Sequence, residues 1–311
     1  MIHIACCSNE KLAPMFGVVM TSVGVNVKSD DVMMYLLHNG LKDKTIKRLN
    51  RIAERFHIGL ELKEINASLL KDCPTNKKLH YADIMMYARL LLPSMLPDLD
   101  KVIYLDCDLV VNQDLNSLWD FDLNNVAVAM VPDSFYNKID ILQRLGISDG
   151  KYLNSGVILM NLEYWRKHNI QTIVLAYILE NGDSLIYPDQ DALNVILKDE
   201  RKELPIKYNV APYHFYINLE NFPKDKYAEI ASARKSPVIF HYLGTTKPWS
   251  IGSYIPGKEL FLRYQRISGW RHIVIQKHFF KRLLYMLCPN FKKKAWENKT
   301  YIDGWENYYK K

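Results

Sequence analysis

The sequence predicts an α/β protein built around a mostly parallel sheet covered by helices. Two observations support this class. Short apolar runs alternate with segments of helical spacing, and turn residues such as Asn39-Gly40 separate them. At 311 residues and 49% hydrophobic composition, the chain can bury a substantial core, so a folded globular protein is expected.

The first half of the chain alternates regularly. The apolar run at 2–7 predicts a buried strand, and Pro14 suits the first turn of a helix that ends near Val25. The run at 32–37 predicts the next strand, and the apolar spacing within 43–56 predicts a helix. The elements expected to continue this alternation are a strand at 60–65, a helix at 82–92 stopped by Pro93, and a strand at 101–105.

The second half begins with a strand at 126–131, ended by Pro132-Asp133. The polar stretch 134–150 is expected to be a loop with one short helical piece, as a segment that covers a substrate would be. Residues 152–161 start with small polar side chains and end as a core strand. The remaining expected elements are helices at 165–181 and 192–197 and a strand at 237–242.

The charge divides the chain into two parts. Residues 268–311 hold ten Lys or Arg and three Asp or Glu, which accounts for the whole net charge of +7. The same stretch holds three of the six tryptophans. We therefore expect one domain at 1–267 and a basic, aromatic, helical appendage at 268–311. The appendage would either bind an anionic membrane surface or pack on the domain as a helical hairpin. Nucleic acid is not expected, because no binding motif accompanies the charge.

The five cysteines are odd in number and form no Cys-x-x-Cys pair, which argues against a disulfide framework and a zinc site. A reducing cytoplasm fits best. We expect neither a signal peptide nor a membrane span, because the apolar segment Met15–Val27 is short and interrupted.

Two carboxylates follow the strand at 101–105. On an extended chain, Asp106 and Asp108 would point to the same side and Cys107 away from them, so the pair could converge on one hard cation. Taken alone, such a pair is more often two solvated turn residues or caps. Other parts of the chain must decide between these interpretations.

Four motifs in a fixed order provide that context. They are Tyr104–Asp108, Tyr152–Val157, Asp189–Asp191 and His241–Trp249. With these motifs and the helix Tyr87-Ala88-Arg89-Leu90, the chain resembles the family 8 glycosyltransferases over roughly residues 1–265. Bacterial lipooligosaccharide α-galactosyltransferases are the nearest likeness and glycogenin is a more distant one.

The resemblance implies a GT-A type fold for nucleotide sugars, with a mixed, mostly parallel sheet. It also implies that Asp106, Asp108 and His241 hold Mn²⁺, with Mg²⁺ as an alternative, on the diphosphate of UDP. Carboxylates and imidazole suit this ion. His241 alone would be read as a core histidine. By the same resemblance Lys247 contacts the diphosphate, and Gly244 lets the backbone approach it.

Family positions that hold the donor sugar match Arg89, Asn154, Ser155, Asp189 and Gln190. Such side chains both donate and accept hydrogen bonds, as sugar hydroxyls require. Gln190 and Asp189 are the candidate catalytic residues, and Gln190 matches the residue opposite the leaving UDP. Because an amide is a poor nucleophile, we expect transfer on the front face, with retention of configuration implied by the family.

The first loop departs from the family pattern. It reads Asn9-Glu10-Lys11-Leu12 where relatives carry Asp-Glu-Asn-Tyr. The amide oxygen of Asn9 could still accept from uracil, and the backbone of Cys6 and Cys7 is a further candidate, as is Cys107 at the nucleotide. Acceptor positions that match the family are Asp133, Tyr187, Pro212, Tyr213, Leu243 and Thr245.

The sequence therefore predicts an enzyme, a retaining hexosyltransferase that uses UDP-galactose or UDP-glucose and Mn²⁺. Its acceptor would be a sugar on a surface glycan, glycolipid or glycoprotein. We place it in the cytoplasm, with the inner face of the cell membrane as an alternative site. A catalytically inactive nucleotide- or glycan-binding module is the competing class. A metal phosphohydrolase or nucleotidyltransferase is less favoured, because a richer carboxylate cluster is missing from the sequence.

Overall fold

A computed structural model describes residues 1–28, 31–75, 83–133, 139–244, 246–250, 253 and 255–270. It separates into two compact units, each made of three chain segments. The first unit comprises Met1–Ala13, Lys28–Cys107 and Leu115–Leu204. The second comprises Pro14–Val27, Asp108–Asp114 and the chain from Pro205 on.

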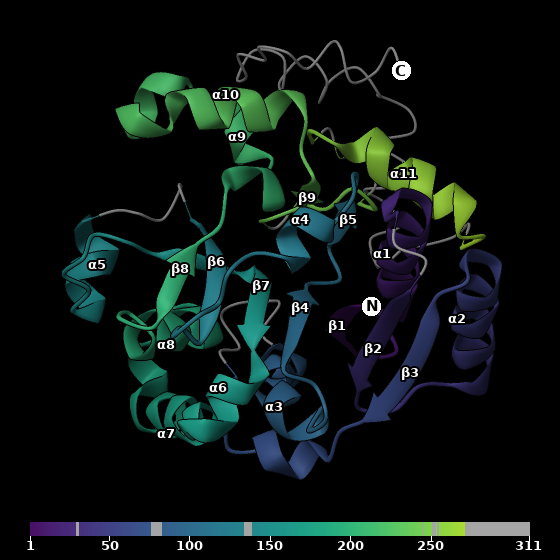
Figure 1. Ribbon diagram of the computed structural model, residues 1–311, viewed down its shortest axis with the longest axis horizontal. Helices are drawn as coiled ribbons and strands as arrows, with labels where there is room; N and C mark the ends of the chain where they lie inside the picture. The colour runs from purple at the N-terminus through teal and green to yellow at the C-terminus, as the bar shows by residue number, and fades with distance from the viewer. Residues whose placement is uncertain are drawn as a thin grey trace, which may run out of the picture. The chain divides into compact units, whose positions relative to one another are not determined.

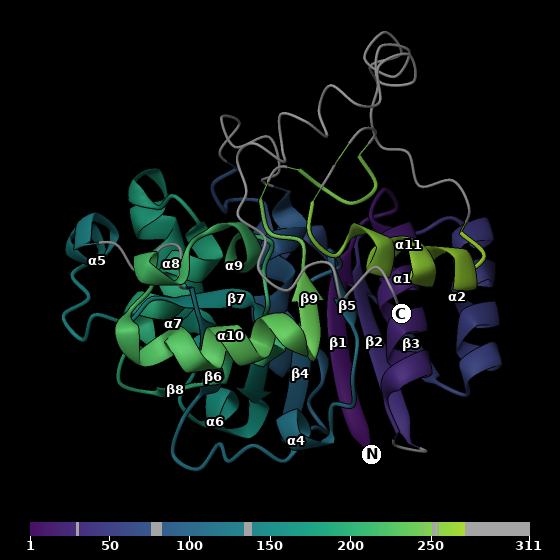
Figure 2. The same ribbon diagram turned by 90° about the horizontal axis from the view of Figure 1, so that it is seen from above.

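A seven-stranded sheet forms the centre of the first unit (Figures 1 and 2). Its strand order is β3-β2-β1-β4-β7-β6-β8, with four parallel and two antiparallel pairings. The predicted mostly parallel, mixed sheet is therefore confirmed. The strands are β1 (Ile2–Ser8), β2 (Val32–His38), β3 (Gly59–Glu64), β4 (Lys101–Leu105), β6 (Val128–Pro132), β7 (Leu153–Asn161) and β8 (Arg201–Glu203).

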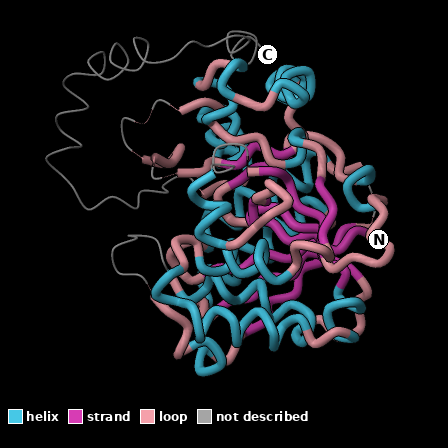
Figure 3. Tube along the Cα trace, turned by 90° about the vertical axis from the view of Figure 1, so that its left-hand side faces the viewer, coloured by secondary structure: helices cyan, strands magenta, loops and turns pink. Residues whose placement is uncertain are grey.

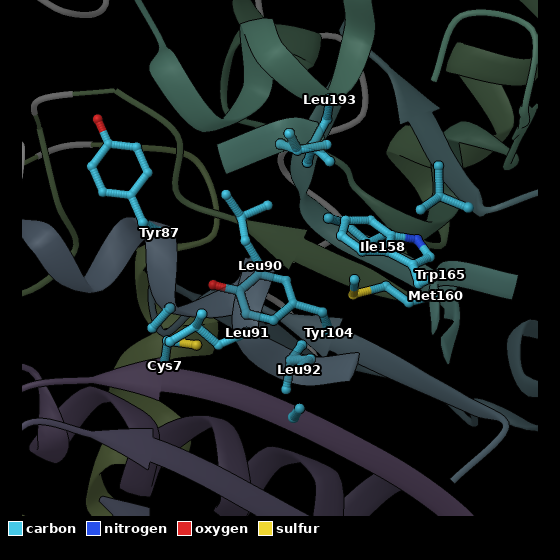
Figure 4. Packing of buried hydrophobic residues seen from close by; sticks show 14 of the residues in the cluster. Cys7, Tyr87, Leu90, Leu91, Leu92, Tyr104, Ile158, Met160, Trp165 and Leu193 are labelled. Atoms are coloured by element: carbon cyan, nitrogen blue, oxygen red, sulfur yellow. The ribbon is translucent and has the colours of Figure 1, made fainter. Parts of the chain in front are cut away.

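One face of this sheet carries the main core of the first unit. Alternate residues such as Val102 and Tyr104 on β4, and Ile158 and Met160 on β7, point to the same side because side chains alternate along a strand. Figure 4 shows the side chains of this cluster, which includes Trp165. The covering helices are η2 (Ile84–Leu91), α3 (Leu92–Met95), α6 (Leu162–Lys167), α7 (Ile170–Asn181) and α8 (Pro188–Ile196).

The other helices of the first unit are short, except for α2. They are α2 (Asp43–Phe56), η1 (Ala67–Leu70), α4 (Asn116–Trp119), α5 (Ile139–Leu145) and η3 (Gly182–Ser184). Helix, strand and loop can be followed along the described chain in Figure 3. Within the described residues, no helix combines the length and apolarity needed to cross a membrane.

The second unit holds a two-stranded antiparallel sheet of β5 (Leu109–Val111) and β9 (Ile239–His241). The Asn26 amide nitrogen donates to the Val111 carbonyl oxygen at 3.0 Å and contacts the Tyr264 hydroxyl at 2.7 Å, which joins three of its elements. Its helices are α1 (Ala13–Asn26, from Pro14 on), η4 (Ile206–Tyr208), α9 (Tyr213–Tyr216), η5 (Leu219–Asn221), η6 (Lys224–Lys226), α10 (Tyr227–Lys235) and α11 (Lys258–Ile267).

Two proline predictions were wrong in detail. Pro93 does not stop a helix, because it stands in the first turn of α3, where the missing N–H needs no partner. The helix expected at 192–197 starts four residues earlier, since Pro188 begins α8 for the same reason.

Two further predictions were wrong about continuity. The helix expected at 165–181 is divided into α6 and α7, because Asn169 adopts a left-handed φ of 52° between them. The segment Asp106–Asp108 is not extended, since it forms a turn between β4 and β5.

Several elements of the structure were not predicted, among them β8, α10 and α11. The last of these ends at Ile267, where the sequence places the domain boundary. Residues 271–311 lie outside the described residues, so the division into a domain and an appendage stays a prediction.

Candidate active site

The candidate site of the first unit lies at the edge where its parallel strands end. β1 ends at Ser8 and β4 at Leu105, and these neighbours mark the point where the strand order reverses. In open α/β sheets, ligands bind outside the carboxyl ends of strands at such a point. Because β7 runs antiparallel to β4, its first residues reach the same edge, and the Asp106 N–H donates to the Gly156 carbonyl at 2.9 Å.

Arg89 is the buried centre of this edge. Its guanidinium donates to an Asp106 carboxylate oxygen at 2.8 Å and to the Ser155 carbonyl at 2.6 Å, and it pairs with Asp189 at 3.3 Å. The guanidinium also lies over the Tyr104 ring, 4.4 Å from its centroid. The sheet and helices thus bring together residues that stand far apart in the sequence.

The two carboxylates beside Arg89 differ in their surroundings. Asp189 is buried, and this burial raises the pKa of its carboxyl; Arg89 opposes the shift, and the Asp106 charge adds to it. The side chain of Asp106 is 24% exposed, and the Tyr104 hydroxyl donates to it at 2.6 Å. Burial acts to lower the pKa of Arg89. Its neighbours, of which Asp106 has the largest effect, outweigh burial and hold that pKa above its usual range.

A second buried cluster surrounds Gln190. Its amide oxygen lies 3.1 Å from the Asn154 amide nitrogen and 3.0 Å from the Ser155 N–H. The amide nitrogens of Asn154 and Gln190 both donate to Asp133, at 3.0 and 3.3 Å. An amide oxygen that accepts several hydrogen bonds is suited to orient a ligand, not to attack it. The donor-sugar candidates are therefore neighbours in the first unit, and Asp133 lies with them.

Asp191 holds the loop before α8 in place, and sequence reasoning assigned it no role beyond membership of a motif. Its fully buried carboxylate accepts from the Tyr152 hydroxyl at 2.5 Å, from the N–H groups of Ile186 and Tyr187 at 2.9 and 3.2 Å, and from Arg144 at 3.2 Å. A buried carboxylate with this many donors fixes the backbone that carries its neighbour Gln190.

The second unit contains the other carboxylate of the pair. Asp108 lies 3.0 Å from Nε2 of His241 through one oxygen and 2.5 Å from Nζ of Lys247 through the other. Burial acts to raise the pKa of Asp108, but the charges of Lys247 and His241 outweigh it and hold that pKa well below its usual value. The Lys247 ammonium also donates to the Tyr242 carbonyl at 2.7 Å.

A second contact orients the imidazole of His241. Its Nδ1 lies 2.9 Å from the amide oxygen of Asn209, and its Nε2 lies 3.0 Å from a carboxylate oxygen of Asp108, so both ring nitrogens face acceptors. Imidazole ligands of metals are oriented by such an outer hydrogen bond. Asn209 was missed by sequence reasoning, because it stands outside every motif.

Asp106 and Asp108 stand on either side of the point where the chain passes from the first unit to the second. A separation of two residues limits the distance between their Cα atoms to about 7 Å. The backbone of Cys107 thus joins the two residues directly. Cys107 turns inward between them, and its thiol donates to the Cys7 carbonyl at 3.3 Å.

Two hydrogen bonds hold Asn9 in the first loop. The amide oxygen of Asn9 accepts from the Leu12 N–H at 2.9 Å, and its amide nitrogen donates to Asp83 at 2.5 Å. The oxygen proposed for uracil therefore already has a partner in the loop. Cys6 is fully buried within the sheet and Cys7 nearly so.

The remaining acceptor candidates have less defined surroundings. Tyr213 and Pro212 are buried in the second unit at the start of α9, and Leu243 is half-buried. Tyr187 lies in the first unit beside Asp191. Gly244 is exposed with a φ of 93°, which favours glycine. Thr245 lies outside the described residues.

With this geometry established, comparison with known proteins identifies the family. The model of "Glycosyl transferase family 8" matches residues 3–251, which is most of the chain. The chain belongs to glycosyl transferase family 8. Membership confirms the family predicted from the four motifs.

Curated relatives extend over nearly the same length. General stress protein A of Bacillus subtilis (strain 168) is 30% identical over 282 residues, which cover 88% of this chain and 96% of that protein. A lipopolysaccharide 1,2-glucosyltransferase of Escherichia coli (strain K12) is 26% identical, with 88% and 85% covered.

Solved structures agree on the fold. The galactosyltransferase LgtC, determined with donor and acceptor sugar analogues, superimposes with a TM-score of 0.77 at 25% identity, covering 86% of this chain and 96% of that one. The family 8 chain thus has the predicted GT-A fold, and the prediction of an enzyme, a hexosyltransferase, is confirmed.

Proposed function

We propose that this family 8 enzyme transfers galactose or glucose from a UDP donor to a sugar acceptor, with retention of configuration. Lipopolysaccharide-type glycolipids are the acceptor class that we favour. Relatives named lipopolysaccharide 1,2-glucosyltransferase and lipopolysaccharide 1,3-galactosyltransferase support this choice of donor sugars and acceptor. The observation that carries the proposal is the arrangement of Asp108, His241 and Asn209 in the second unit.

The donor set fits a divalent cation. A metal requires the neutral imidazole with a lone pair on Nε2, and in that state Asn209 would accept the hydrogen bond from Nδ1 of His241 while Nε2 faces Asp108. With Asp106 two positions away, we propose Asp106, Asp108 and His241 as ligands of Mn²⁺. Oxygen and imidazole ligands suit Mn²⁺, and Mg²⁺ is the alternative. When bound, the ion would neutralise charge on the diphosphate of the departing UDP.

Other residues of this chain would bind the diphosphate and the donor sugar. Lys247, whose ammonium already lies at Asp108, is positioned to offer a cation to the diphosphate. We assign the donor sugar to the cluster around Arg89 and Gln190, since it presents charged and amide groups in fixed directions. Gln190 would orient the sugar, because its amide is not a competent nucleophile.

We also propose that the enzyme works at the inner face of the cell membrane. The finding that no described helix could span a membrane is consistent with work in the cytoplasm at the inner face of the membrane. Soluble donor would be bound there, and a lipid-linked acceptor would be reached at the bilayer surface.

The direct test is turnover with each donor. The protein is incubated with UDP-galactose or UDP-glucose, with and without Mn²⁺, and UDP release is measured. We expect release to require the metal. Release at the same rate after chelation would contradict the proposed site.

A variant separates binding from folding. Asp108→Ala should lose Mn²⁺-dependent UDP binding; because the change also removes the ion-pair partner of Lys247 and His241, urea unfolding is measured alongside to show that the variant is folded. Asp225→Ala, which removes an exposed carboxylate from η6, is the matched control. Unchanged UDP affinity of Asp108→Ala in Mn²⁺ would remove the basis of the proposal. Metal-dependent binding without turnover on any donor would favour an inactive binding module.

A further inference from the structure

Helix α2 carries a row of cations on its exposed face. Lys44, Lys47, Arg48, Arg51 and Arg55 are all exposed. At 3.6 residues per turn, these five positions fall within a sector of roughly 100° around the helix axis. We call these five residues the α2 cationic row.

The row is separate from the face that anchors the helix. Thr45, Leu49, Ile52 and Ala53 are buried and lie on a different side of α2. From its first to its last member, the row spans about 16 Å at 1.5 Å per residue. The helix is thus held by its apolar face and presents its charge outward.

A hollow accompanies the row. It has a volume of about 440 Å³ and is lined by Asp43, Lys44, Lys47, Arg48 and Arg51. Of the described residues that line it, all but Asp43 are cationic. Within the described residues, Lys44, Lys47 and Arg51 form no ion pair, so their charge is available to an anionic group.

The helix begins beside the loop that follows β1. One carboxylate oxygen of Glu10 accepts from the Lys42 N–H at 3.0 Å, and the other accepts from the Thr45 hydroxyl at 2.9 Å. Glu10 directly follows Asn9 at the edge of the sheet where the candidate site lies. The cationic row therefore starts next to that edge.

We propose that the α2 cationic row docks the protein on an anionic lipid surface. A straight, one-sided row suits a plane of negative head groups. Single-stranded nucleic acid fits less well, because no Phe, Tyr or Trp is exposed on α2 for base stacking; Phe56 is half-buried. The proposal does not depend on sugar transfer.

The test is sedimentation of the full chain with vesicles of phosphatidylcholine alone or mixed 3:1 with phosphatidylglycerol. The row variant is Lys44→Gln/Lys47→Gln/Arg51→Gln. The matched control, Lys71→Gln/Lys167→Gln/Lys198→Gln, removes three exposed cations elsewhere on the first unit. We expect the row variant to bind the anionic vesicles roughly 100-fold more weakly, while the control binds like the unmodified protein. Residues 268–311 are present in every protein compared, so their contribution cancels.

A charge-preserving variant, Lys44→Arg/Lys47→Arg/Arg51→Lys, should retain binding, and added salt should weaken it. Circular dichroism checks that each variant is folded. Equal affinity of the row variant and its control for anionic vesicles would overturn the proposal. Binding to a 30-nucleotide single strand is measured for the same proteins. If the row variant loses this binding but still binds anionic vesicles, the proposal is overturned and the surface is assigned to nucleic acid.

Discussion

Asn209 provides the sharpest test of the proposed metal centre, because it is not one of the proposed ligands but contacts one of them, His241. The substitution Asn209→Ala removes the acceptor 2.9 Å from Nδ1 of His241. Without it, the neutral imidazole can place its proton on Nε2, the atom proposed to bind the ion. Loss of such an outer hydrogen bond weakens metal affinity about 10- to 100-fold, or about 1.4–2.8 kcal/mol.

The same change has a cost in stability that must be measured separately. His241 is 1% exposed, so the loss of the buried hydrogen bond between Asn209 and its Nδ1 should cost about 1–3 kcal/mol. Urea unfolding gives this quantity directly. Calorimetric titration of Mn²⁺ into protein saturated with UDP gives the metal affinity of the folded fraction.

Asn221→Ala is the control, since Asn221 is exposed in the same unit and is expected to change neither quantity. Binding of Mn²⁺ by folded Asn209→Ala within twofold of the unmodified protein would refute a positioning role for Asn209. A stability loss without an affinity loss would mean that Asn209 only satisfies a buried histidine.

Two further predictions concern stability. Asp191→Ala should lower the free energy of unfolding by about 1–3 kcal/mol, because it removes a fully buried acceptor that four donors share; a loss below about 0.5 kcal/mol in urea would contradict the network. His214 is buried and its pKa is lowered to about 3, first by burial and then by Arg234. Below the unfolded pKa of about 6.5, the unfolded chain binds a proton at His214 that the folded protein does not bind. The free energy of unfolding therefore falls by up to about 1.4 kcal/mol per pH unit as the pH drops from 6.5 toward 3. Urea unfolding between pH 7 and pH 5 should show that the free energy of unfolding depends less steeply on pH in His214→Gln than in the unmodified protein. Equal slopes for the two proteins would count against this role of His214.

Much of the fold could be predicted because its signals are local. Alternating apolar runs and helical spacing predicted a mostly parallel sheet, and ordered motifs predicted the family and the enzyme class. The antiparallel placement of β7 could not be predicted, since Leu153–Met160 is buried on both faces and such a strand has the same pattern in either direction.

The candidate site was predictable where a motif carried it and not elsewhere. Arg89, Asp189 and Gln190 were found by resemblance. The contacts of Asn209 with His241 and of Asn9 with Asp83 join residues 32 and 74 positions apart, so no local pattern could show them. The uracil contact proposed for Asn9 stays a prediction, and the bond from the Leu12 N–H gives it a competitor.

The pairing of β5 with β9 has a consequence for synthesis. Leu109 pairs with His241, which leaves the ribosome more than a hundred residues later. At about 5–20 residues per second, the three buried apolar residues of β5 wait on the order of ten seconds for their partner. During this interval an unpaired apolar edge is available to other chains. The nascent protein should therefore be most exposed to aggregation, and most dependent on chaperones, after its large sheet is complete and before β9 emerges.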